Sequence, residues 1–253
     1  MTKEIKHVHG NIKIKLVKFL SKQFASILFI FFKIFFPKAK KYSNEILISR
    51  ATYAPWKIDH KFMSIFSKVN DLTLLDYPRL YTFFFLSKQI KKLKGDILDI
   101  GCMKGGVGIL LSFMNTNGRV MLFDTFEGFL DKEILHKNNI FKFEGLDELK
   151  KIIKKYKLKN TFVYKKYFPN EIKNLSIKKI KLCHIDVNTY VSTKRSFYYV
   201  KNKMVRNGII IFDDYGVHGV EKVTNFVNRL IKKEKGNFIF IQNYFGQCIL
   251  LKK

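Results

Sequence analysis

The sequence has 253 residues, which fits one α/β domain with an appended segment or at most two small domains. Its apolar content of 47% excludes a disordered chain, and its three cysteines form no CxxC pair, which argues against a disulfide framework or a zinc site and favours a reducing compartment. The formal net charge of +28 comes mostly from lysine, which favours a solvated lysine surface over specific nucleic-acid recognition. Attraction to anionic lipid, glycan or nucleic acid stays open as the alternative.

Residues 1–42 form a basic and apolar N-terminal extension. The run 24–36 is apolar except for Ser26 and Lys33, and it is shorter than the ~20 residues that span a bilayer. Lysines beside an aromatic run favour a helix in the membrane interface, so we expect peripheral membrane contact through residues 12–36. The protein would then be cytoplasmic, at the inner face of the membrane. A helix that packs on the domain or on a partner subunit of a homo-oligomer, and a true span, remain alternatives.

The rest of the chain predicts an α/β fold with a helical N-terminal cap. Residues 43–94 form the cap, in which Pro78 predicts a helix start. Residues 95–253 predict a Rossmann-like, mostly parallel sheet with helices on both faces and a C-terminal antiparallel hairpin. The expected strands are 96–100, 119–123, 161–164, 180–187, 208–212, 238–242 and 248–251. One expected helix follows the glycine loop and ends at residue 113, and the others span 146–156, 190–205 and 220–232.

Acidic residues stand where the predicted parallel strands end. Asp124 ends the second strand, Asp186 ends the fourth, and the pair Asp213 and Asp214 ends the fifth. Ligands of open α/β sheets bind beyond the carboxyl ends of the strands, so we expect a site at this edge.

A glycine loop follows the first strand. Asp99, Gly101, Gly105 and Gly106 belong to it, and such glycines let the backbone approach a ligand at the start of a helix. The acid-x-Gly-x-x-x-Gly spacing differs from the dinucleotide GxGxxG and resembles motif I of methyltransferases that use S-adenosylmethionine (SAM). Asp124, about twenty residues further on, suits hydrogen bonds to two ribose hydroxyls, with a helix N-cap as the alternative.

Three carboxylates predict a divalent metal site. Adjacent strands would bring Asp186, Asp213 and Asp214 together, where they repel each other unless a cation holds them. Oxygen ligands of this kind suit Mg²⁺, while a set of caps and turn residues is the structural alternative.

The same acids suggest how an alcohol oxygen is activated for methyl transfer. A metal lowers the pKa of the hydroxyl, and a nearby base accepts its proton. Asp186 is the first candidate for catalytic base and His218 the second. We expect His184 to point to the opposite face of the sheet from Asp186 and to be structural.

Several motifs together resemble the macrocin O-methyltransferase family of SAM-dependent sugar O-methyltransferases. They occur in order over residues 45–253, with Ala54-Pro-Trp56 and Arg79-Leu-Tyr81 in the cap. The others are Gly95-Asp-Ile-Leu-Asp-Ile-Gly-Cys-Met-Lys-Gly-Gly106, Phe123-Asp-Thr-Phe-Glu-Gly-Phe129, Tyr167-Phe-Pro169, His184-Ile-Asp-Val-Asn-Thr-Tyr190 and Ile211-Phe-Asp-Asp-Tyr-Gly216.

The resemblance implies a Rossmann-like methyltransferase with SAM as methyl donor, Mg²⁺ as cofactor and a sugar hydroxyl as acceptor. It implies that Gly101 and Gly105 line the methionine end of SAM and that Asp124 holds the ribose. Phe126 and Glu127 would lie near the ribose or the adenine. The metal ligands would be Asp186, Asp213 and Asp214.

The chain departs from the family at Asn188, where a second Asp is common, and in its N-terminal extension. We expect that Asn188 lowers the negative charge of the site and that the chain still folds. The expected partner is a glycan or small-molecule acceptor, and a membrane-proximal glycan would fit the extension. A catechol-like acceptor, a non-catalytic membrane-associated relative and an RNA methyltransferase remain alternatives.

Overall fold

The computed structural model describes residues 54–115, 117–128, 145–217 and 219–253, together with seven helical residues between Phe19 and Ile30. The predicted membrane-interface segment, apart from those seven residues, and the second base candidate His218 lie outside the described residues and stay predictions. Residues 56–253 form one unit. Within the described part of the chain, no helix has the length and apolarity that a bilayer span requires.

Seven strands form one sheet in the order β3-β2-β1-β4-β5-β7-β6. Strands β1 to β5 pair in parallel, and β7 runs antiparallel to both β5 and β6. This arrangement confirms the predicted Rossmann-like sheet with its closing hairpin. The strands are β1 Asp96–Ile100, β2 Val120–Asp124, β3 Thr161–Lys165, β4 Ile180–Ile185, β5 Met204–Phe212, β6 Phe238–Asn243 and β7 Gln247–Lys252.

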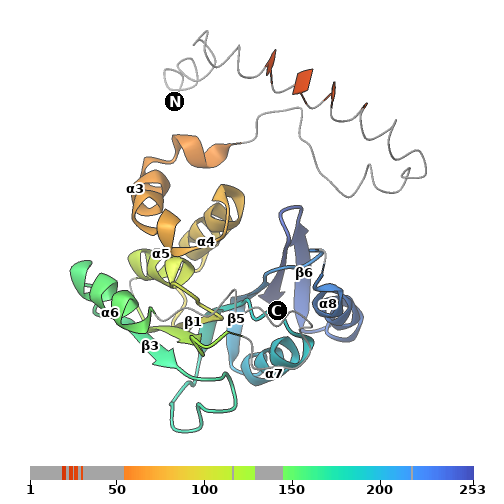
Figure 1. Ribbon diagram of the computed structural model, residues 1–253. Helices are drawn as coiled ribbons and strands as arrows, with labels where there is room; N and C mark the ends of the chain where they lie inside the picture. Colours follow the sequence, from red (N-terminus) through yellow and green to blue (C-terminus); the bar gives the residue numbers. More distant parts are fainter. Residues whose placement is uncertain are drawn as a thin grey trace. The chain divides into compact units, whose positions relative to one another are not determined.

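Helices cover the two faces of the sheet and create two hydrophobic cores (Figure 1). Helices α3, α4, α5 and α6 pack over one face, and α7 and α8 pack over the other. The predicted cap helices therefore share a core with the sheet. The helices are η2 Pro55–Ile58, α3 His60–Val69, η3 Asn70–Leu72, α4 Tyr77–Gln89, α5 Gly106–Met114, α6 Leu146–Lys155, α7 Tyr190–Val200 and α8 Glu221–Lys233.

Helix α4 begins where local sequence signals place it. The Asp76 side chain accepts a hydrogen bond from the backbone N–H of Arg79, and Pro78 stands in the first turn. A carboxylate at the N-cap satisfies an otherwise unpaired N–H, and proline has no N–H to lose there. The predicted helix start at Pro78 is confirmed.

Two adjoining predicted boundaries, the end of α7 and the start of β5, are wrong. Helix α7 ends at Val200 rather than at residue 205, and β5 begins at Met204 rather than at residue 208. The backbone N–H of Lys203 bonds to the Val200 carbonyl, which closes a turn, and Met204 then pairs with Ile180 of β4. Burial of Met204 in the core under α7 stabilises this longer strand.

Side-chain alternation decides which residues reach the site. On β1, β4 and β5, the side chains of Ile97, Leu182 and Ile209 pack into the core that α3, α4 and α5 cover. Residues at even spacing along the same strands point to the same face. Moving towards the carboxyl ends, that face carries Asp99, His184, Asp186 and Asp213.

Candidate active site

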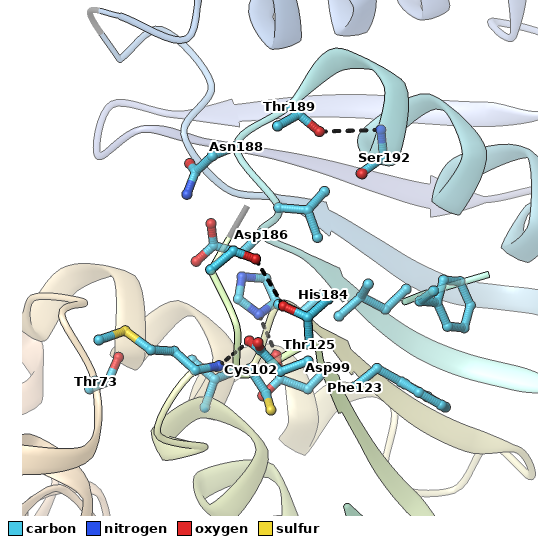
Figure 2. A pocket seen from close by; sticks show the side chains of 18 of the residues that line it. Thr73, Asp99, Cys102, Phe123, Thr125, His184, Asp186, Asn188, Thr189 and Ser192 are labelled. Atoms are coloured by element: carbon cyan, nitrogen blue, oxygen red, sulfur yellow. Dashed lines mark hydrogen bonds and ion pairs between the residues drawn. The ribbon is translucent and has the colours of Figure 1, made fainter. Parts of the chain in front are cut away.

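A cavity opens at the carboxyl ends of the parallel strands, the edge at which the sequence predicts a ligand site. Its walls come from the segment after η3, the glycine loop and the loops that follow β2, β3 and β4 (Figure 2). The polar and charged residues among those that line it are Thr73, Asp99, Asp124, Thr125, Lys166, Tyr167, His184, Asp186, Asn188, Thr189 and Ser192.

Asp124 joins the glycine loop to the end of β2. One carboxylate oxygen accepts a hydrogen bond from the backbone N–H of Met103 (2.8 Å), and the other accepts from that of Phe126 (2.7 Å). Burial raises the pKa of Asp124, and these two bonds oppose the rise. Each oxygen keeps a second lone pair, so the side chain can still accept bonds from a diol that enters the cavity.

Asp99 presents one carboxylate oxygen that has no partner. Its Oδ1 lies 2.8 Å from His184 Nδ1, whereas Oδ2 is buried without a hydrogen bond. Asp99 is fully buried and lines the cavity. A buried, unpaired carboxylate oxygen carries a desolvation cost, which a cationic ligand in the cavity would offset.

His184 lies on the same face of the sheet as Asp186, and the expectation of opposite faces is wrong. The two residues are separated by two positions, and side chains alternate with a period of two. Burial would lower the pKa of His184, but hydrogen bonds to Asp213 and Asp99 raise it to about 10. The imidazole is therefore protonated and bridges two carboxylates; its Nε2 lies 3.3 Å from Asp213 Oδ2.

Asp213 is fully buried, and both of its carboxylate oxygens form hydrogen bonds. Its Oδ1 accepts from Arg79 Nη1 of α4 (3.2 Å) and from the backbone N–H of Asp214 (3.0 Å). Its Oδ2 faces His184 and accepts from Gln247 Nε2 of β7 (3.4 Å). Burial opposes ionisation, but His184 and Arg79 hold the pKa of Asp213 below its usual value.

For Asp186 and Asp214, the nearby cations do not offset the cost of burial. Burial and the charges of Asp213 and Asp214 raise the pKa of Asp186 well above its usual range. Burial and Asp213 likewise raise the pKa of Asp214. Ligand atoms of His184, Asp186 and Asp213 lie within 4.8 Å of one another, a spacing that a single metal ion can bridge, and Asp214 is outside this group.

The predicted cofactor glycines have different positions. Gly101 lines the cavity, and a Cβ there would overlap the carbonyl of Asp186, so this glycine lets the loops after β1 and β4 touch. Gly105 packs on Leu149 of α6, and Gly106 packs on the backbone of Leu72; neither lines the cavity. Their contact with a cofactor stays a prediction.

Phe126 and Glu127 also stand beside the cavity rather than in its wall. Phe126 is buried and belongs to the core under α3 to α6. Glu127 is exposed, and its carboxylate lies 2.8 Å from Lys165 Nζ. Their predicted place near the ribose or the adenine is not tested by these contacts.

Strained backbone surrounds the cavity. Met103, Phe126, Asn188 and Asp214 have φ angles of 48°, 56°, 54° and 59°, in the left-handed region that non-glycine residues rarely adopt. They follow β1, β2, β4 and β5 in turn. Such conformations cluster where a site is held in shape for function.

Several residues in or beside the wall were not predicted as site residues. The segment 72–75 reaches the cavity from the cap, and Arg79 reaches Asp213 from α4. Thr189 caps α7 through a bond from the backbone N–H of Ser192 (3.3 Å), and both line the cavity. Only the motif 167–169 and its place after β3 pointed to the wall formed by residues 166–168.

Comparisons with known proteins agree with this fold. The family described as Macrocin-O-methyltransferase (TylF) matches residues 82–237. The fold resembles the O-methyltransferase NovP (TM-score 0.63, 17% identity, 72% of this chain and 82% of NovP). It also resembles the calicheamicin methyltransferase CalS11 (TM-score 0.58, 14% identity, 96% and 94%) and an O-methyltransferase from Bacillus cereus in complex with SAH (TM-score 0.51, 16% identity, 85% and 97%). No curated protein matches the sequence significantly.

Proposed function

The chain belongs to the macrocin-O-methyltransferase family and is a SAM-dependent O-methyltransferase, and from this premise we propose that it methylates a sugar hydroxyl with the help of Mg²⁺. The reaction converts SAM and an alcohol into S-adenosylhomocysteine (SAH), a methyl ether and a proton. The observation that carries the proposal is the convergence of Asp186 and Asp213 beside a cavity that also exposes Asp99 and Asp124.

Asp99 and Asp124 fit the two polar ends of SAM. The unpaired Oδ2 of Asp99 suits the ammonium of the methionine part, because a charge-assisted bond would satisfy it. The two oxygens of Asp124, already fixed by Met103 and Phe126, suit the ribose hydroxyls. The acids thus hold the donor from both sides of the glycine loop.

The donor set after β4 and β5 fits a divalent cation. Among the described residues, four buried or half-buried carboxylates, Asp99, Asp186, Asp213 and Asp214, lie near two cationic groups that pair with acids of this set, Arg79 and His184. Acidic groups therefore exceed basic ones in this set, and burial together with the neighbouring carboxylates raises the pKa of Asp186 and of Asp214. Carboxylate oxygens are the ligands that Mg²⁺ prefers, so Asp186, Asp213 and Asp214 would hold it, with Asp213 giving up its long bond from Gln247 (3.4 Å). Bound there, Mg²⁺ would make an acceptor hydroxyl easier to deprotonate.

Asp186 is the residue we assign to proton transfer. It lines the cavity and directly follows β4, next to Gly101 of the glycine loop. Its carboxylate accepts the proton that the acceptor hydroxyl loses as the methyl group arrives. The fixed loops around it hold the acceptor oxygen in line with the methyl group, and positioning of this kind accounts for much of the rate.

A methyl-transfer assay tests the proposal. The protein is incubated with Mg²⁺, SAM that carries a labelled methyl group, and separate panels of nucleotide sugars, glycosylated metabolites and catechols. We expect label in sugar ethers and not in catechol ethers, and we expect Asp186→Asn to abolish the transfer. The matched control is Asp147→Asn on α6, whose side chain is 84% exposed and which should leave the transfer unchanged. Label in catechols alone would contradict the sugar assignment.

A further inference from the structure

We propose that His184 is a positioning residue that ties Asp99, the acid of the cofactor half of the site, to Asp213, the acid of the metal half. The inference rests on the proposed function, because it takes Asp99 as a partner of SAM and Asp213 as a metal ligand. It adds that the two halves are held by one side chain.

The sheet register places these three residues in one row. Asp99 of β1 is the direct neighbour of His184 on β4, and His184 is the neighbour of Ile211 on β5. Asp213 follows Ile211 by two residues, so its side chain returns to the same face. The row crosses three parallel strands at their carboxyl ends, where the loops to both halves begin. Figure 2 shows two of its members, Asp99 and His184, side by side.

Both ring nitrogens of His184 are engaged in the row. Nδ1 lies 2.8 Å from Asp99 Oδ1, and Nε2 lies 3.3 Å from Asp213 Oδ2. With both nitrogens directed at carboxylate oxygens, the ring presents no free nitrogen to a metal ion. The geometry therefore favours a bridge between carboxylates over a metal ligand, although His184 lies within ligand distance of Asp186 and Asp213.

Helix α4 packs against His184 and Asp213. The ring of Phe83 packs edge-on against the His184 ring, with centroids 4.6 Å apart. Arg79, one turn earlier on α4, bonds to the other oxygen of Asp213. His184 is 2% exposed and cannot turn away to water. Each carboxylate therefore keeps one oxygen on the bridge. The other oxygen of Asp99 is unpaired, and the other oxygen of Asp213 accepts from Arg79 and from the backbone N–H of Asp214.

The bridge predicts separable losses. An Asn amide at position 184 reaches about as far as Nδ1, so His184→Asn keeps a donor for Asp99 and loses the donor for Asp213. A Gln amide reaches about as far as Nε2, so His184→Gln does the opposite. Loss of a buried donor of this kind weakens binding by about five- to a hundredfold.

The experiment measures SAH and Mn²⁺ binding to the full chain by calorimetry, with Mn²⁺ as the probe for the divalent site. We expect His184→Asn to keep SAH affinity and lose Mn²⁺ affinity, and His184→Gln to keep Mn²⁺ affinity and lose SAH affinity. The matched control is Cys183→Ala, a fully buried neighbour on β4 that points into the opposite core and should change neither.

Equal weakening of both ligands by both variants, or no weakening by either, would overturn the bridge and leave His184 as a packing residue. A folded wild-type protein that binds neither ligand would instead overturn the proposed function. Should the variants not fold, the ring nitrogen NMR signals of wild-type His184 decide the matter. The bridge predicts that SAH and Mg²⁺, added separately, each shift them, and no shift with either ligand would overturn it.

Discussion

The two ends of strands β1 and β4 carry buried charges in opposite balance. At the amino ends, the carboxylate of Asp96 accepts from the backbone N–H and the guanidinium of Arg119 (Nη2 to Oδ2, 2.5 Å). The buried Lys181 donates to the carbonyl and the side chain of Asn117 (2.9 and 2.6 Å). Each charge there has protein partners, and acid does not exceed base.

At the carboxyl ends the acids outnumber the cations. Asp213 is paired with Arg79 and His184, whereas burial and the neighbouring carboxylates raise the pKa of Asp186 and of Asp214. The same strands therefore end in a balanced network on one side and in an unbalanced one on the other. In the balanced network each charge has hydrogen-bond partners within the protein. In the unbalanced network the buried acids repel one another, and a bound cation would reduce this repulsion.

The largest effect should follow from Asp213→Ala. The change leaves Arg79 and His184 without their shared partner in a buried place, which costs about 3–5 kcal/mol of the free energy of unfolding. It also removes a proposed metal ligand, so Mn²⁺ binding should disappear. Urea denaturation and calorimetry measure the two effects. Unchanged Mn²⁺ affinity in a folded variant would show that the cation does not bind here.

Asp96→Ala should cost stability alone. It removes the ion pair to a half-exposed Arg119 and one hydrogen bond to the backbone, so we expect a loss of about 1–2 kcal/mol in the free energy of unfolding. Affinities for SAH and Mn²⁺ should stay within about twofold of wild type. A large loss of either affinity would mean that the two ends of the strands are not independent.

Asp124→Ala should weaken SAH binding by at least tenfold, about 1.4 kcal/mol. The variant loses the carboxylate proposed for the ribose and frees the N–H groups of Met103 and Phe126. Calorimetry checks it, with Asp147→Ala on the exposed face of α6 as the control. An SAH affinity equal to that of wild type would mean that Asp124 only stabilises the glycine loop and does not bind the ribose.

The smallest effect concerns pH. The folded pKa values of Asp186 and Asp214 are raised, so the metal-free protein loses stability as pH rises from the unfolded value of about 4 through the folded values. Mg²⁺ offsets this repulsion only when the carboxylates are ionised. The increase in Tm on adding Mg²⁺ should therefore be larger at about pH 8 than at about pH 5. Equal increases, measured by thermal unfolding against a chelator control, would contradict the assignment.

Local sequence patterns predicted the sheet well and one helix end badly. Short apolar runs followed by glycine or aspartate located all five parallel strands, because burial and chain reversal leave strong local signals. The end of α7 was missed because the turn at 201–203, Lys-Asn-Lys, contains neither glycine nor proline. That turn is fixed by pairing of Met204 with Ile180, a contact between distant residues.

The sequence predicts which residues lie at the end of each strand, but it does not predict the contacts between strands and helices at the site. Asp99, Asp124, Asp186 and Asp213 could be assigned to the carboxyl edge because each ends a strand or starts its loop. Counting residues by two would also have placed His184 on their face. The ion pair from Arg79 to Asp213 depends on how α4 lies over β5, and no local pattern specifies such a contact.

Calorimetry of SAH with the full-length wild-type chain, in Mg²⁺ and in chelator, tests the central claim most directly because it does not require the acceptor. We predict a micromolar dissociation constant, which is a binding free energy of about −8 kcal/mol, and we expect it to persist in chelator. The reason is that the proposed SAH contacts of Asp99 and Asp124 do not involve the cation. A folded protein that binds no SAH in either buffer would contradict the assignment of this cavity to the methyl donor.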